Sequence, residues 1–208
     1  MTKNSFFTGT NQDYQAALLL LNKIFQVKKR LPEQVFKSPF LGFVCGDFDN
    51  CMSVDFWDLL LQPLGKKLND SHILTAVLDP DPKNYFYHNF GYYNMLNLPI
   101  NMTGAEYLNN LVIGPAENEA DAILYNSEVV VWVPNGGRWA IWGERSYEVC
   151  ILAFADEQAM TLALPLLNKN WKSADNGLNS FVLKHVSKSF LTSFMSNYLI
   201  GGKGWKLN

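Results

Sequence analysis

The chain has 208 residues, of which 48% are hydrophobic and 17% are charged. That length suits one large domain or two small ones, and a charged share below the usual quarter argues against an intrinsically disordered chain. No apolar run approaches the roughly twenty residues that cross a bilayer. Three cysteines at no recognised spacing and an N-terminus without a leader pattern favour a reducing compartment. We therefore expect a cytoplasmic protein without membrane association.

Charge is distributed unevenly along the chain, although the net charge is only −2. Residues 44–135 contain twelve acidic residues and three lysines, which gives −9 for that segment. Residues 1–43 contain six basic and two acidic residues, which gives +4. This asymmetry predicts an acidic surface in the middle of the chain, and such a surface attracts basic partners.

Helices are expected where apolar residues recur at helical spacing behind a capping residue. These segments are 13–30, a helix that begins at Ser53 and ends near Gly65, 103–113, 156–164 and 179–199, the longest. Thr103 and Glu106 form a capping-box pattern, and Asp156 is an N-cap residue. The cations of Lys28–Arg30 are expected to stabilise the C-terminus of the first helix.

Strands are expected at 40–45 and 73–78 and in the stretch from Ser127 to Asp156. Within that stretch, runs of β-branched and aromatic residues flank Asn135-Gly136-Gly137, which is typical of hairpins. Two of its runs are apolar at almost every position, so both faces of the sheet should be covered. The sequence predicts an α+β fold with a mostly antiparallel sheet, a meander over 128–155, covered by amphipathic helices. We expect a single domain over 1–208, with an N-terminal helical subdomain over 1–70 as the alternative.

Residues 83–102 show neither a helical nor a strand period and are rich in tyrosine and phenylalanine. Tyrosine is enriched at the energetic centres of protein interfaces, and this segment lies within the acidic block. We therefore predict that the chain binds a basic protein through an acidic, aromatic surface. The expected contact residues are Asp47, Asp49, Asp79, Asp81, Tyr85, Tyr87, Tyr92 and Tyr93. The alternative is that these rings fill the core beneath a long loop.

The segment Trp139-Ala-Ile-Trp-Gly-Glu-Arg-Ser-Tyr-Glu148, followed by an apolar strand, resembles a pattern in uncharacterised bacterial immunity-type proteins of polymorphic toxin systems. The resemblance covers about thirty residues and carries no catalytic residue to transfer. It implies a non-enzymatic inhibitor that neutralises a cognate toxin by binding it. Glu144 and Arg145 are expected either to pair as a salt bridge in the turn or to face a partner.

Two other functions remain open. A small hydrolase could use Asp79, Asp81 and His88, or a pair of Cys45 or Cys51 with a histidine. An accessory domain of a secretion or assembly system would form a stable homo-oligomer.

No cofactor, metal or nucleic acid is expected. The loop from Asp47 lacks the glycine and glutamate of an EF-hand, Asn135-Gly136-Gly137 lacks the phosphate-loop lysine, and the aromatic segment is acidic.

Overall fold

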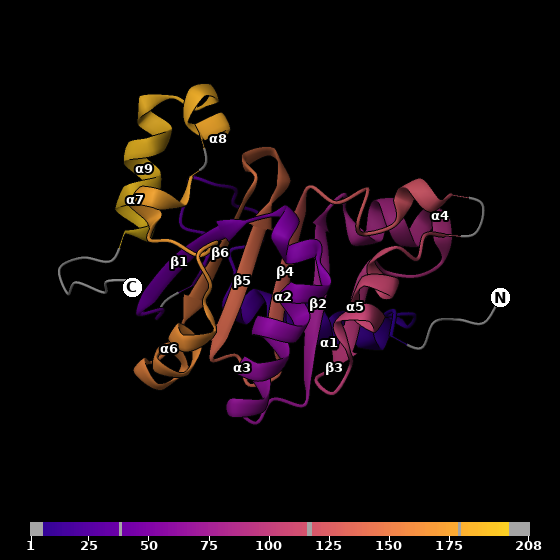
Figure 1. Cartoon of the computed structure of the whole chain (residues 1–208). Helices are drawn as coiled ribbons and strands as arrows, with labels where there is room; N and C mark the ends of the chain where they lie inside the picture. Colours follow the sequence, from indigo (N-terminus) through magenta and orange to yellow (C-terminus); the bar gives the residue numbers. More distant parts are fainter. Residues whose placement is uncertain (1–5, 38, 116–117, 179, 200–208) are drawn as a thin grey trace.

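The computed structural model describes residues 6–37, 39–115, 118–178 and 180–199, and its centre is a six-stranded sheet (Figure 1). The strands are β1 (Gly42–Asp47), β2 (His72–Asp79), β3 (Met95–Pro99), β4 (Val129–Pro134), β5 (Trp139–Glu144) and β6 (Val149–Phe154). Their spatial order is β1-β6-β5-β4-β2-β3, and every neighbouring pair is antiparallel. The predicted α+β fold is confirmed, and β4, β5 and β6 form the predicted meander.

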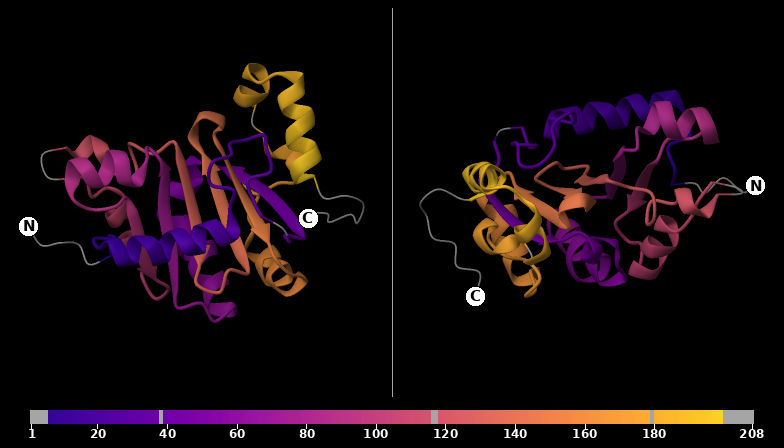
Figure 2. Two further views of the ribbon diagram at one scale, coloured as in Figure 1. Left: turned by 180° about the vertical axis from the view of Figure 1, so that it is seen from behind. Right: turned by 90° about the horizontal axis from the view of Figure 1, so that it is seen from above.

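Helices cover both faces of the sheet, which gives three layers (Figure 2). On one face, the α2 side, lie α2 (Val54–Phe56), the π-helical turn η2 (Trp57–Leu61), α3 (Gln62–Lys67), α5 (Gly104–Leu111) and α6 (Glu157–Ala163). On the other, the α1 side, lie α1 (Asn11–Ile24), α7 (Ala174–Gly177), α8 (Ser180–His185) and α9 (Lys188–Tyr198). Successive residues alternate between these cores: Trp132 packs on the α2 side, whereas Val131 and Trp142 pack on the α1 side. Every residue of β4, β5 and β6 is buried, as expected for a doubly covered sheet.

Short helical turns occupy the connections. They are η1 (Asp49–Met52), η3 (Pro82–Tyr87), α4 (His88–Phe90), η4 (Glu119–Asp121), η5 (Arg145–Tyr147) and η6 (Leu164–Leu166). The segment predicted to be irregular, 83–102, contains η3, α4 and the unpredicted strand β3. In the ranges that the structure describes, no helix combines the length and apolarity that a bilayer crossing requires.

The first helix is shorter than predicted. It begins after Thr10, whose side chain accepts the Asp13 N–H, and it ends at Ile24. Phe25 is extended and pairs with Phe36 in an isolated bridge, so the chain turns back before the basic cluster. The prediction that Lys28–Arg30 stabilise a helix C-terminus is therefore wrong, because these residues lie in a loop.

The predicted long helix over 179–199 is also wrong, although residue 179 itself lies outside the described residues. The segment forms α8 and α9, separated at Ser187. The Ser187 hydroxyl accepts the Phe190 N–H at 3.1 Å and so begins a second helix. The predicted caps at Ser53 and Asp156 and the Thr103–Glu106 capping box are confirmed.

Candidate functional site: the acidic end of the sheet

Strand pairing brings acidic residues that are distant in sequence to one end of the sheet. Asp47 pairs with Val149, Val149 with Glu144, Glu144 with Val129, and Val129 with Asp79. Strands lie about 4.8 Å apart, so this row from β1 to β2 spans about 19 Å. We call this the acidic end; it is the upper end of the sheet in Figure 1. It comprises Asp47, Asp79 and Glu144 at strand ends, Glu128 beside β4, and four residues of the connections, Asp49 in η1, Asp121 in η4, Asp81 and Glu148.

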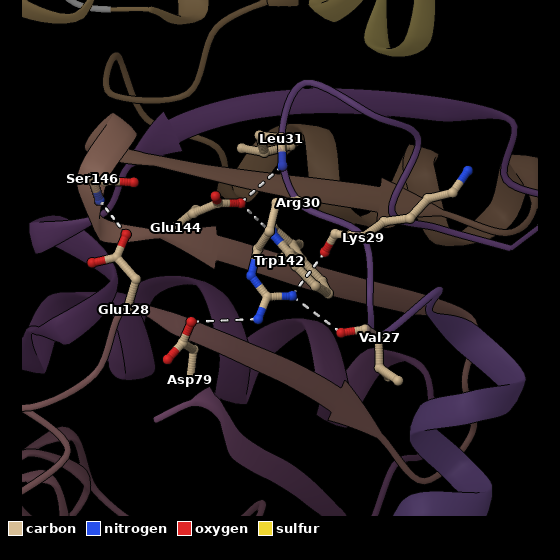
Figure 3. A network of polar contacts seen from close by, with 9 residues as sticks. All are labelled: Val27, Lys29, Arg30, Leu31, Asp79, Glu128, Trp142, Glu144 and Ser146. Carbon is tan, nitrogen blue, oxygen red and sulfur yellow. Dashed lines mark hydrogen bonds and ion pairs between the residues drawn. The ribbon is translucent and has the colours of Figure 1, made fainter. Parts of the chain in front are cut away.

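Glu144 is the structural centre of this end (Figure 3). Its side chain points to the α1 side and the residue is 4% exposed. One carboxylate oxygen accepts the backbone N–H of Leu31 at 3.0 Å and the indole Nε1–H of Trp142 at 3.2 Å. Burial raises the pKa of Glu144, although both hydrogen bonds and the nearby charge of Arg30 oppose the shift. This carboxylate therefore anchors the loop after α1 and is not free to bind a partner.

Arg30 partly neutralises the acidic end. Its guanidinium lies 3.4 Å from the Asp79 carboxylate and also donates to the carbonyl oxygens of Val27 and Lys29 (Figure 3). The Arg30 and Asp79 side chains are 37% and 48% exposed, so water screens the pair and its contribution to stability is small. The basic loop after α1 thus borders the acidic end.

Arg145 lies on the opposite face of the sheet from Glu144. Its guanidinium donates to the carbonyl oxygens of Ser127 and Leu124 at 2.7 and 2.9 Å and stacks over the Phe48 ring. Among the described residues these two neighbours form no ion pair, because Glu144 ends β5 and points to the α1 side, whereas Arg145 begins η5 and lies over Phe48 on the α2 side. The alternative of a Glu144–Arg145 salt bridge is therefore wrong.

The four aspartates predicted as contacts all lie at the acidic end. Asp47, Asp49 and Asp81 are exposed, and Asp79 is half-exposed. Asp47 Oδ1 accepts the Asp49 N–H at 2.9 Å, and Asp81 Oδ1 accepts the Lys83 N–H at 2.9 Å as the N-cap of η3. The second carboxylate oxygen of Asp47 and of Asp81 has no hydrogen-bond partner among the described residues, so it is available to a ligand.

The four predicted tyrosines separate into surface and core. Tyr85 and Tyr87 are 38% and 37% exposed, and Tyr92 is half-buried. Tyr93 is only 2% exposed, with its ring stacked 3.9 Å from that of Tyr14 and 4.5 Å from that of Tyr87. The prediction that Tyr93 contacts a partner is wrong, because α1 covers this ring.

Asp121 is part of this site, and the sequence reasoning missed its role. The residue is 4% exposed; its carboxylate accepts the Tyr85 hydroxyl at 2.9 Å and the side-chain amides of Asn118 and Asn126. The hydrogen bond to Asp121 raises the pKa of the Tyr85 hydroxyl, while burial and then Asp121 raise that of Tyr92 to about 12. Asp121 therefore positions the tyrosines beside the aspartates.

The residues proposed for a hydrolase do not form a described site. Burial raises the pKa of the Cys45 thiol to about 12, so this thiol stays protonated, and the side chain of Cys51 is fully buried. No group of three His, Cys, Asp or Glu side chains within the described residues is arranged to hold a metal ion. None of Asp79, Asp81 and His88 lines any of three clefts that lie among the described residues and measure about 380, 180 and 120 Å³.

Comparisons of the chain with family models, with curated proteins and with solved structures gave no match.

Proposed function

We propose that this chain is a non-enzymatic, cytoplasmic binding protein of the immunity type, which neutralises a basic protein partner by covering its active site. The observation that carries the proposal is the strand register, which brings the exposed Asp47 and the half-exposed Asp79 to the same end of the sheet, four strand steps apart. Exposed carboxylates gathered in this way raise the rate of encounter with a basic partner and select against acidic ones.

The aromatic residues supply the second component of such an interface. Tyr85 and Tyr87 lie beside the aspartates with more than a third of their surface exposed. Hydrogen bonding to Asp121 holds Tyr85 in place before binding, which lowers the entropy cost of ordering it at an interface. Tyrosine is enriched among the residues that contribute most to the affinity of protein–protein contacts.

The segment that resembles immunity-type proteins reaches the acidic end only with its last residues, from Glu144 to Glu148; Trp139 lies at the opposite end of β5, and every residue of β5 is buried. It forms β5, the turn η5 and the residue before β6, and it contributes Glu144 and Glu148. At the exposed Glu148, the resemblance and the charge distribution therefore support the same surface.

The proposal is tested by capturing partners from a lysate of the source cells with the tagged chain and then measuring affinity for the captured protein. A stoichiometric basic partner that is toxic alone and harmless when co-expressed with this chain supports the immunity role. The double variant Asp79→Asn/Asp81→Asn should weaken binding and make it less sensitive to salt, because fewer charges contribute.

The matched control is Asp13→Asn/Glu157→Gln, which removes two exposed negative charges from α1 and α6, away from the acidic end. This control should leave affinity unchanged. If the wild type and the Asp79→Asn/Asp81→Asn variant bind the partner with equal affinity, the acidic end is not part of the interface.

A further inference from the structure

A separate cleft of about 180 Å³ opens next to the acidic end, on the α2 side of β1. We call it the anchor cleft; the residues used below are Asp47, Asp55, Phe56, Leu59, Leu60 and Trp171. It adjoins α2 and β1, which lie near each other in Figure 1. Sites for drug-sized molecules usually measure about 300–1,000 Å³, so this cleft suits a single long side chain rather than a cofactor.

The inner lining of the anchor cleft is apolar and well fixed. Phe56, Leu60 and Trp171 are 6%, 3% and 8% exposed, whereas Leu59 is 52% exposed. The ring of Trp171 lies against Gly46, where an added Cβ would come within 3.0 Å of two ring carbons. The ring is therefore held in place by the backbone of β1, and the lining is formed before any partner binds.

Trp171, which lines the cleft, also carries a hydrogen-bond donor, its indole Nε1–H. No described residue accepts a hydrogen bond from this donor, although the side chain is more than nine-tenths buried. This nitrogen is not one of the fully buried polar atoms without a partner, which among the described residues are Thr75 Oγ1 and Asn94 Nδ2, so water reaches it. An occupant of the cleft would replace this water by placing an oxygen acceptor beside Trp171.

The polar lining of the cleft consists of two acidic residues and the neutral residues Asn50, Ser53, Asn168 and Asn170. Asp47 and Asp55 are exposed, and no described cation forms an ion pair with either carboxylate. Lys169 and Lys172 line a neighbouring cleft of about 120 Å³ that shares Asp47, but neither lines the anchor cleft. The anchor cleft thus presents two carboxylates without a counter-charge in its lining.

We propose that the anchor cleft receives an arginine side chain from the protein partner, an inference that rests on the proposed function. The methylene stem would lie on Leu59 and Trp171, and the guanidinium would reach Asp47 and Asp55. A backbone carbonyl next to that arginine would accept the Trp171 indole N–H. Arginine suits the site better than lysine because its planar head is more weakly hydrated and can bind two carboxylate oxygens at once.

The test uses N-acetyl-arginine amide as the probe and N-acetyl-citrulline amide as its neutral analogue of the same shape. Binding is followed by the indole N–H resonance of Trp171, which is assigned by its loss in Trp171→Phe. Arginine amide should shift this resonance saturably, with an affinity on the order of 1 mM, whereas citrulline amide should not. Asp47→Asn/Asp55→Asn should weaken arginine binding by roughly fivefold or more, while the other indole resonances confirm an intact fold.

Equal shifts with citrulline amide, or no saturable shift with arginine amide, would overturn the assignment. With a captured partner, loss of affinity in Asp79→Asn/Asp81→Asn but not in Asp47→Asn/Asp55→Asn would retain the proposed function and reject the anchor cleft. If the cleft binds arginine amide specifically but no basic partner is captured, the cleft remains an arginine-binding site and the proposed function is rejected.

Discussion

The carboxylate of Glu144 accepts the backbone N–H of Leu31 at 3.0 Å, a hydrogen bond between residues 113 positions apart in the chain. It fastens the loop between α1 and β1 to the end of β5. The same loop is held by α9, where the Tyr198 hydroxyl accepts the Val35 N–H at 3.0 Å and the Asn197 amide donates to Pro32 O at 2.7 Å. One buried carboxylate and the end of one helix thus order the basic loop that borders the acidic end.

Replacing Glu144 should separate the loss of an acceptor from the loss of a charge. Glu144→Ala leaves the N–H groups of Leu31 and Trp142 without their acceptor, so we expect the free energy of unfolding to fall by about 2–3 kcal/mol. Glu144→Gln retains a carbonyl oxygen for both donors and should cost less than half as much. Urea unfolding measures both variants. Stability in Glu144→Ala equal to that of the wild type would show that this acceptor is dispensable.

The raised pKa of Glu144 predicts a pH dependence of stability with a defined sign. The folded chain holds the Glu144 proton more tightly than the unfolded chain, in which the pKa of glutamate is about 4.3. The stabilising contribution of the protonated group is therefore complete below about pH 4.3 and is lost as the pH rises through the raised folded-state pKa.

The measurement is urea unfolding of the wild type and Glu144→Gln over a pH series from acidic to neutral. The wild type should lose stability relative to the variant as the pH rises. Burial raises the pKa of Asp70 too, but this residue is present in both proteins and its effect cancels in the difference. A difference that stays constant with pH would contradict a raised pKa at Glu144.

Tyr93 and Tyr87 should respond differently to substitution, because one ring is in the core and the other at the surface. Tyr93→Ala removes a buried ring that stacks on both Tyr14 and Tyr87. We expect the free energy of unfolding to fall by about 3 kcal/mol or more. Tyr87→Ala removes a ring that is 37% exposed and should cost only about 1 kcal/mol.

Thermal or urea unfolding compares the two tyrosine variants, and Tyr93→Phe is the control that retains the stacking. If Tyr87→Ala and Tyr93→Ala lower the free energy of unfolding by similar amounts, α1 does not cover the Tyr93 ring. Affinity for a captured partner should fall in Tyr87→Ala and remain near the wild-type value in Tyr93→Phe.

Gly177 should tolerate no side chain, because α7 approaches β1 closely at this position. An added Cβ would lie 2.2 Å from Cβ of Cys45, so Gly177→Ala must displace α7, at an expected cost of about 1–3 kcal/mol. Gly91→Ala is a useful contrast: the Cβ would meet no atom within 4 Å, but the φ of +74° costs about 1 kcal/mol.

Chemical unfolding measures the stability of the two glycine variants. Hydrogen exchange follows the C-terminal helices separately. Gly177→Ala should increase exchange in α7 and α9, whereas Gly91→Ala should affect only its own turn. Unchanged exchange in α7 would argue against the close approach to Cys45.

Local chemistry allowed several elements to be predicted from the sequence. The caps at Ser53, Thr103 and Asp156 act within three residues of themselves, and the apolar runs of β4, β5 and β6 are separated only by short turns. Such features depend on neighbouring residues, so the sequence reveals them. The strand β3 was not recognised, because it forms by pairing with β2 and its aromatic surroundings hide any periodicity.

The composition by itself determined that the middle of the chain is acidic and aromatic, since charge and residue type do not depend on folding. Only the tertiary structure placed Asp47 and Asp79 at one end of the sheet, because β1 pairs with β6 and β2 pairs with β4 across long stretches of chain. The same long-range packing buried Tyr93 under α1 and directed Glu144 toward Leu31. Local sequence cannot specify such contacts, because their stability comes from surfaces that meet only after the strands have paired.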